Sequence, residues 1–218
     1  MAIAKTIKRR TLADESFNLL KQRIISGFYK PDHALRQDEL AKELGVSRIP
    51  LREALLKLEA DGLIDILAHK GGIVRALSFD KAQELFDLRI LIECDLIVKS
   101  VPKMTSENFA NAEIALKEFD KIALNEENIE DWTELNWQFH YKLYEAAEKE
   151  ETIKILKSLH SNCDRYIRKQ LLVAGAGNQA HKQHMKLLEY CKSGDVSAAV
   201  GELKSHITEV FNGIGEFV

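Results

Sequence analysis

The chain has 218 residues, a formal net charge of -3, 45% hydrophobic residues and 30% charged residues. This length allows one large or two small domains, and the composition is ordinary for a soluble globular protein. No apolar run approaches the roughly 20 residues that cross a bilayer, and the basic start MAIAKTIKRR lacks the apolar segment of a signal peptide. We therefore expect a cytoplasmic protein with no membrane partner.

The charge is divided unevenly along the chain. Residues 1–77 contain 14 Lys and Arg against 10 Asp and Glu, a balance of +4, whereas residues 78–218 contain 17 against 24, a balance of -7. A basic head on an acidic body is expected when only one end of a protein approaches phosphate. We predict one domain over residues 1–77 and a second over residues 78–218.

The first predicted helix runs from about Thr11 to Ser26 and ends at Gly27, with one apolar face formed by Ala13, Phe17, Leu20 and Ile24. Tyr29 to Leu35, which contains Pro31, is expected to be an extended connector. Arg36 then opens the next helix. Its guanidinium could bind a phosphate, and a purely solvated arginine is nearly as good an interpretation.

Two short helices separated by a glycine turn follow. The first spans about Gln37 to Leu44 and ends at Gly45, because glycine adopts the left-handed backbone conformation at low cost. The second begins at Ser47, whose hydroxyl is expected to cap the helix, and continues to Gly62. Its buried stripe is predicted to consist of Leu51, Ala54, Leu55 and Leu58. Such a pair is either a helix-turn-helix or an ordinary helical corner.

In a helix-turn-helix the N-terminal end of the second helix enters the major groove, where arginine can pair with guanine. Ser47, Arg48 and Arg52 are placed for such contacts. Residues 63–67 and 73–77 then form two predicted strands. Their connecting tip, a basic wing that could lie along a groove or a phosphate strand, contains His69, Lys70, Gly71 and Gly72.

The order of LGVSR, PLREAL, LEADGL and a glycine-rich wing with a histidine resembles the winged-helix domain of the GntR family of bacterial repressors. The resemblance implies sequence-specific DNA binding. Because one small module contacts few bases, we expect a homodimer on an imperfect palindrome. Ile49 departs from the family, which usually has threonine or a similar small polar residue there, so a base or phosphate contact expected at that position is in doubt.

From Ser78 onward the apolar pattern is helical, and short links join the segments. The chain is therefore predicted to be mostly α, with an N-terminal winged helix-turn-helix followed by an all-helical bundle. The expected helices cover residues 78–100, 106–125, 129–149, 152–173, 178–192 and 196–211 or slightly beyond. Cys94, Cys163 and Cys191 lie in these patterns and are expected to be reduced thiols.

Three of these helices each direct one histidine toward the interior, namely His140, His184 and His206. Asn136 lies one helical turn before His140 on the same apolar stripe. A buried imidazole needs a polar partner, which a divalent metal can supply. Spacing alone leaves two interpretations open, a metal site and three separately satisfied core histidines.

The segments DLRILIE, NWQFHYKLYEAA and HMKLLEYCKSGDVSAAV, and the later His206, resemble the helical FCD ligand-binding domain of the FadR subfamily of GntR regulators. Many members bind a metal through an Asp or Asn, a histidine four residues later and two further histidines. The resemblance thus implies that the ligands are Asn136, His140, His184 and His206, with zinc the first choice and nickel or another transition metal the alternatives. Asn136 departs from the commoner aspartate.

Arg89 also lies on an apolar stripe, so its guanidinium should point into the bundle. It either forms a structural pair with a carboxylate such as Glu93 or Asp95, or, as the resemblance implies, binds the carboxylate of a small organic acid beside the metal. Arg165 and Asn162 are further candidates for that effector. His160 and His181 are reserve candidates near inward faces.

The hypothesis that unites these features is a ligand-responsive transcriptional regulator, most simply a repressor, and not an enzyme. Its body would bind a metal and a small carboxylate. One rival is a metal sensor without an organic effector, and another is a metalloenzyme fused to a DNA-binding head. The sequence shows no general base and no nucleophile motif beside the histidines.

Overall fold

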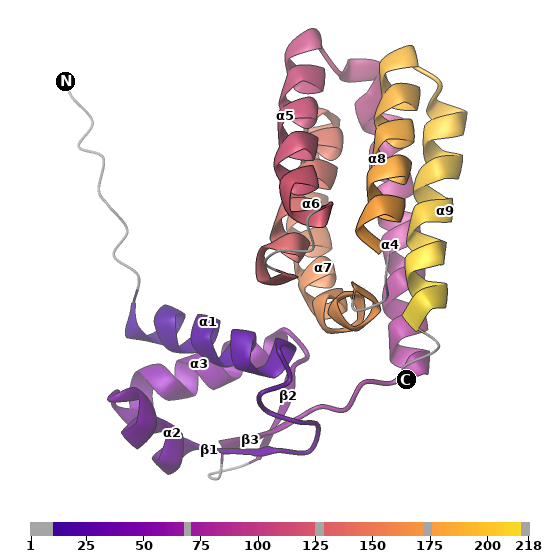
Figure 1. Ribbon diagram of the computed structural model, residues 1–218. Coiled ribbons are helices and arrows are strands. Elements are labelled where there is room, and N and C mark those ends of the chain that lie inside the picture. Colours follow the sequence, from indigo (N-terminus) through magenta and orange to yellow (C-terminus); the bar gives the residue numbers. More distant parts are fainter. Residues whose placement is uncertain (1–10, 68–70, 125–128, 172–175, 215–218) are drawn as a thin grey trace, which may run out of the picture. The chain divides into compact units, whose positions relative to one another are not determined.

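The computed structural model describes residues 11–67, 71–124, 129–171 and 176–214 (Figure 1). The chain divides into two compact units, residues 1–76 and residues 77–218, and each has its own hydrophobic core. Among the described residues, no helix combines the length and apolar character needed to cross a membrane.

The first unit is a small winged helix-turn-helix. Its elements are α1 (Leu12–Ile25), β1 (Ala34–Arg36), α2 (Gln37–Leu44), α3 (Arg48–Ala60), β2 (Ile64–Leu67) and β3 (Gly71–Val74). Thr11 and Asp14 form a reciprocal capping box at the start of α1, and Gly45 ends α2 with a φ of 64°. The predicted stripe of α3 is buried and packs against α1, as expected.

The sheet differs from the predicted two-stranded hairpin. It has three antiparallel strands in the order β1-β3-β2, and β1 lies within the segment expected to be a connector. The strand was missed because three residues are too few to show an alternating pattern. The prediction that Gly71 and Gly72 belong to the wing tip was also wrong, because both residues lie in β3.

The position of Gly71 is explained by the close approach of β1. Gly71 pairs with Arg36, has a φ of 113°, and a Cβ atom there would lie 1.9 Å from the carbonyl oxygen of Leu35. Only glycine fits both the backbone conformation and this contact. Gly71 therefore holds the three strands together. The neighbouring residues His69 and Lys70 lie outside the described part of the chain.

The second unit is the expected helical bundle. Its long helices are α4 (Phe79–Ser100), α5 (Ser106–Ala123), α6 (Ile129–Tyr144), α7 (Glu150–Leu171), α8 (Ala176–Ser193) and α9 (Val196–Ile214). Figure 1 shows these helices running alongside one another. Two 3-10 turns, η1 (Val101–Lys103) and η2 (Glu145–Ala147), join α4 to α5 and α6 to α7.

Two local features position the helices that contain the histidines. The helix predicted over residues 129–149 ends at Tyr144, and Glu148 then reverses the chain with a φ of 56°. No glycine or proline there signals this turn. In the first turn of α8, a Cβ atom on Gly177 would lie 1.8 Å from the carbonyl oxygen of Ala123, so glycine allows α8 to approach the end of α5 closely.

Candidate functional site

The N-terminal end of α3 presents the side chains predicted to contact DNA. Ser47, Arg48 and Arg52 are all exposed. Arg48 forms an ion pair with Asp38 of α2, with Nη2 2.7 Å from Oδ1. The first turn of α3 contains no acidic residue, so no carboxylate of the helix itself neutralises its partial positive charge. This end of the helix suits a negatively charged partner.

The expected capping role of Ser47 was only half right. Ser47 has the backbone conformation of an N-cap, but its side chain makes no capping hydrogen bond. Arg36 caps α2 with its backbone, and its exposed guanidinium contacts Glu39 with Nη1 3.2 Å from Oε1. The surface pairs of Arg36 and Arg48 are weak enough to open, since exposed ion pairs stabilise a fold by about 0–1 kcal/mol.

In the second unit, the three predicted histidines converge. His140 of α6, His184 of α8 and His206 of α9 are buried, and each offers a ligand atom within 4.8 Å of those of the other two. The Nε2 atoms of His184 and His206 lie 3.4 Å apart. Tetrahedral zinc with Zn–N bonds of about 2.0–2.1 Å places its nitrogens about 3.3 Å apart, so this pair already has a suitable spacing.

Hydrogen bonds fix the tautomer of His206. Its Nδ1 lies 2.8 Å from Oε1 of Gln183, and the amide nitrogen of Gln183 donates to Glu209 at 2.7 Å. Because that second bond orients the amide, Gln183 presents an acceptor to the ring and Nδ1 must donate. The Nε2 atom of His206 is therefore the acceptor in its contact with Nε2 of His184.

A second chain of hydrogen bonds fixes the tautomer of His140. The hydroxyl of Tyr144 donates to Oε2 of Glu93 at 2.6 Å, and the hydroxyl oxygen of Tyr144 itself lies 3.1 Å from Nδ1 of His140. Tyrosine has one hydroxyl hydrogen, which Glu93 accepts, so Nδ1 of His140 must donate to the hydroxyl oxygen. The Nε2 atom of His140 is then an acceptor. It is buried and has no hydrogen-bond partner among the described residues.

Asn136 contributes a further unsatisfied acceptor. It is buried one turn before His140 on α6, and its Oδ1 has no hydrogen-bond partner in the described chain. The same holds for Nδ1 of His184, the ring nitrogen that does not contact His206. Leaving a buried polar group unpaired costs about 1–3 kcal/mol. Three imidazole nitrogens and one amide oxygen therefore form a donor set that fits a divalent transition metal.

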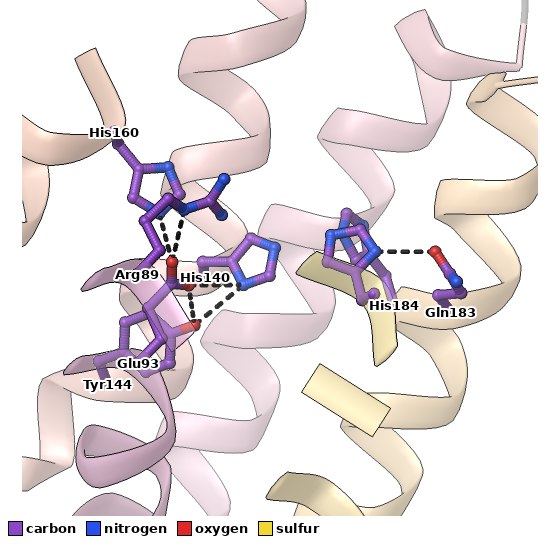
Figure 2. Close-up of polar contacts among 8 residues, drawn as sticks. Arg89, Glu93, His140, Tyr144, His160, Gln183 and His184 are labelled. Atoms are coloured by element: carbon purple, nitrogen blue, oxygen red, sulfur yellow. Dashed lines mark hydrogen bonds and ion pairs between the residues drawn. The ribbon is translucent and has the colours of Figure 1, made fainter. Parts of the chain in front are cut away.

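Arg89 and Glu93 form a buried ion pair beside this cluster. Arg89 is 2% exposed and Glu93 fully buried, and Nε of Arg89 donates to Oε1 of Glu93 at 2.8 Å. His160 of α7 contacts the same oxygen through Nε2 at 3.0 Å. In Figure 2 the ring of His140 lies between Glu93 on one side and His184 on the other. The structural pair considered for Arg89 is thus present.

The electrostatic setting keeps the imidazoles neutral and Glu93 ionised. Burial lowers the pKa of His140 and His184 well below the usual range, and lowers that of His206 to about 4. For Glu93, burial opposes ionisation, but Arg89 and His160 outweigh it and hold the pKa of the carboxyl well below its usual range. Neutral imidazoles are the form that binds metals.

The remaining candidate residues for the metal and the effector lie in different surroundings. His160 joins the Glu93 network, whereas Nδ1 of His181 lies 2.8 Å from Asp120, outside the three-histidine cluster. Asn162 and Arg165 are half-buried on α7, and Oδ1 of Asn162 has no hydrogen-bond partner among the described residues.

Sequence reasoning missed Tyr144 and Gln183 as partners of the histidines. Tyr144 lies four residues after His140, a helical spacing that could have indicated the contact. Gln183 directly precedes His184, yet contacts His206 of the next helix. The three cysteines are free thiols, as expected, with Cys163 and Cys191 buried and Cys94 half-buried.

Comparisons with known proteins match both units. Residues 12–74 match the model of bacterial regulatory proteins of the gntR family, and residues 84–209 match the FCD domain model. The chain is 26% identical over 196 residues to the Nta operon transcriptional regulator of Aminobacter aminovorans, covering 89% of this chain and 90% of that protein.

Two further similarities agree. The HTH-type transcriptional repressor RspR of Escherichia coli strain K12 is 24% identical over 194 residues, which cover 89% of this chain and 85% of the repressor. The solved structure of E. coli McbR/YncC has a TM-score of 0.78 at 19% identity, covering 94% of this chain and 98% of that one, and it shows the shared fold. The matching families and relatives are regulators of transcription and not enzymes.

Proposed function

Because the chain belongs to the GntR family of bacterial regulators and has an FCD domain, we propose that it is a homodimeric, operator-binding repressor controlled by a divalent metal and a small organic acid. The DNA operator would be an imperfect palindrome, since a two-fold dimer presents two copies of α3 to two half-sites. Ser47, Arg48 and Arg52 would contact bases and phosphates. Arg36, together with His69, Lys70 and Gly71 of the predicted wing, would contact the phosphate backbone of the DNA.

One observation supports the metal above all others. His140 and His206 are held by neighbours in the tautomer that turns the lone pair of Nε2 toward the cluster, and both rings belong to a buried cluster with unsatisfied acceptors. Protein metal sites orient their histidines in this way, through the other ring nitrogen. We propose that His140, His184, His206 and Asn136 hold zinc, or nickel or another transition metal, which would supply a Lewis-acidic position for an oxygen ligand.

The proposed organic effector depends on Arg89. Its Nε pairs with Glu93, and Figure 2 draws that contact from Nε and not from the two terminal guanidinium nitrogens. We propose that these nitrogens bind the carboxylate of a small acid, with Arg165 and Asn162 as further contacts. A bidentate pair of this kind suits planar carboxylates. The effector would alter DNA affinity only by binding two arrangements of the dimer unequally.

One observation favours a second candidate. Glu93 already balances the charge of Arg89, so Arg89 needs no organic anion to be stable in the protein interior. The protein would then be a metal sensor without an organic effector.

Titration distinguishes the two candidates. An operator is first selected from a random duplex library with the full-length protein. Its affinity is then measured after chelation, after metal is restored, and after adding a panel of small mono- and dicarboxylates. Under the main proposal, a carboxylate changes operator affinity only when metal is present. If metal alone released the DNA fully, the organic-acid part would be wrong.

A further inference from the structure

Ile49 stands out on the surface of the first unit. With 74% of its surface exposed, it is the most exposed large hydrophobic residue in the described part of the chain. It is the second residue of α3, directly after Arg48. A single exposed apolar side chain is common on protein surfaces, so its meaning depends on what shares its face of the helix.

The face of α3 that contains Ile49 is otherwise polar and exposed near the helix start. Arg52 and Glu53 lie three and four residues further on, both exposed, so they share this face with Ile49. The opposite face, with Leu51 and Leu55, is fully buried. Ile49 therefore adds nothing to the core, and it points in the same direction as the arginine proposed to contact a base.

The major groove offers one apolar group to such a side chain. Thymine presents a C5 methyl there, whereas the other bases present hydrogen-bond donors and acceptors. Ile49 and Arg52 are three residues apart, or about 4.5 Å along a helix axis at 1.5 Å per residue. Base pairs are spaced by about 3.4 Å. Groups that contact both side chains would thus lie one or two base pairs apart.

We propose that Ile49 determines operator specificity by packing against the C5 methyl of a thymine in each half-site, one or two base pairs from the guanine contacted by Arg52. This inference rests on the proposed docking of α3 in the major groove. It does not depend on the metal or the effector. An apolar side chain at this position offers no hydrogen bond to a base edge, and so selects a T·A pair.

Deoxyuridine substitution tests the proposal with single-methyl resolution. A duplex is selected from a random library with the full-length protein, and each thymine of a half-site is replaced in turn by deoxyuridine, which removes only the methyl. Burying one such group is worth about 0.8 kcal/mol, or about fourfold in affinity. We expect one thymine per half-site to show this loss, and about 15-fold when both half-sites are changed.

Three variants complete the test. In Ile49→Ala the deoxyuridine penalty at that thymine should disappear. Leu56→Ala is the matched control, because Leu56 is also apolar, exposed by 49% and on α3, but lies two turns from the helix start. It should retain the penalty in full. The guanine one or two base pairs from that thymine is then replaced by 7-deazaguanine, which removes an acceptor. This change should weaken DNA binding by the wild type but not by Arg52→Ala.

The outcomes separate this inference from the proposed function. Tight binding of a selected duplex without any methyl-dependent thymine, or an equal deoxyuridine penalty in wild type and Ile49→Ala, would overturn the role of Ile49 and leave DNA binding intact. Failure to select any duplex would overturn the proposed operator binding, and the role of Ile49 with it. Circular dichroism of Ile49→Ala, Leu56→Ala and Arg52→Ala checks that these exposed substitutions leave the fold unchanged.

Discussion

Replacing Glu93 with glutamine tests the buried network at its centre. Oε1 of Glu93 accepts hydrogen bonds from Arg89 at 2.8 Å and His160 at 3.0 Å, and Oε2 accepts one from Tyr144 at 2.6 Å. Glutamine keeps the size of the side chain but removes its charge and one acceptor. Arg89, 2% exposed, is then left without the anion that balances it.

The expected loss of stability is large because the pair is buried. Removing one partner of a buried ion pair costs about 3–5 kcal/mol. Asp95 and Lys99 provide a matched control, since they form an i,i+4 pair on the same helix but are 51% and 41% exposed. An exposed pair contributes about 0–1 kcal/mol. Urea unfolding monitored by circular dichroism should therefore show a far larger change for Glu93→Gln than for Asp95→Asn.

The same substitution should reach the metal ligands through a proton. The glutamine amide can take two orientations. If its NH2 group faced Arg89 and His160, two hydrogen bonds would be lost, whereas only the one with Tyr144 is disturbed if the NH2 group faces Tyr144. The second orientation therefore costs less. Tyr144 must then accept, and its hydrogen turns to Nδ1 of His140. The ring proton of His140 moves to Nε2, the atom that faces the cluster. Metal affinity should fall by about 10- to 100-fold, the usual effect of losing such a partner.

Tyr144→Phe separates the two effects. It leaves the Arg89–Glu93 pair intact but removes the hydroxyl that contacts His140, so it should lower metal affinity with less loss of stability than Glu93→Gln. Metal affinity is measured by competition with a chromophoric chelator. Equal unfolding free energies for Glu93→Gln and Asp95→Asn would refute the role of the ion pair. Unchanged metal affinity in both Glu93→Gln and Tyr144→Phe would refute the proton argument.

Three further predictions concern DNA, metal and pH. Arg48→Ala or Arg52→Ala should weaken operator binding by about 1–3 kcal/mol per lost base contact; unchanged affinity of both variants in a gel-shift titration would reject α3 as the recognition helix. His184→Ala combined with His206→Ala should abolish stoichiometric metal in protein purified without chelator, measured by mass spectrometry; retained metal would mean that the ligands are others. The pKa of His206 falls from about 6.5 to about 4 on folding, so the unfolded chain takes up more protons as pH drops through this window. The unfolding free energy of chelator-treated protein should then fall by up to about 1 kcal/mol per pH unit for each such imidazole, and a flat urea-unfolding profile between pH 7 and 5 would contradict this.

The sequence predicted the secondary structure well where an apolar repeat continues over several helical turns. The stripes of α3 and of the bundle helices follow from apolar spacing, because one face of each helix must be buried. The short strand β1 could not be found in this way. Its existence depends on Gly71, whose missing Cβ admits the carbonyl of Leu35, a contact between residues 36 positions apart.

The candidate metal site was predictable in its residues but not in its geometry. Spacing along each helix placed His140, His184 and His206 on inward faces. It could not predict that the three side chains meet. Their convergence depends on how α6, α8 and α9 pack. The orientation of the rings depends on Tyr144 and on Gln183, which contacts His206 from a different helix. Tertiary packing alone creates such a contact.

The charges of the buried cluster connect the proposed metal to the proposed acid. Three neutral imidazoles and the amide of Asn136 bring no negative charge to a dication, and Arg89 and Glu93 cancel each other. A divalent ion there would keep its full excess charge in a site of low dielectric, where an unbalanced charge is costly. A small carboxylate binding to the ion would reduce that excess. Without the metal, Glu93 already balances the charge of Arg89, and the attraction for a second anion is lost. Carboxylate binding should therefore require metal, which is the order of events that separates the effector-controlled regulator from the simple metal sensor.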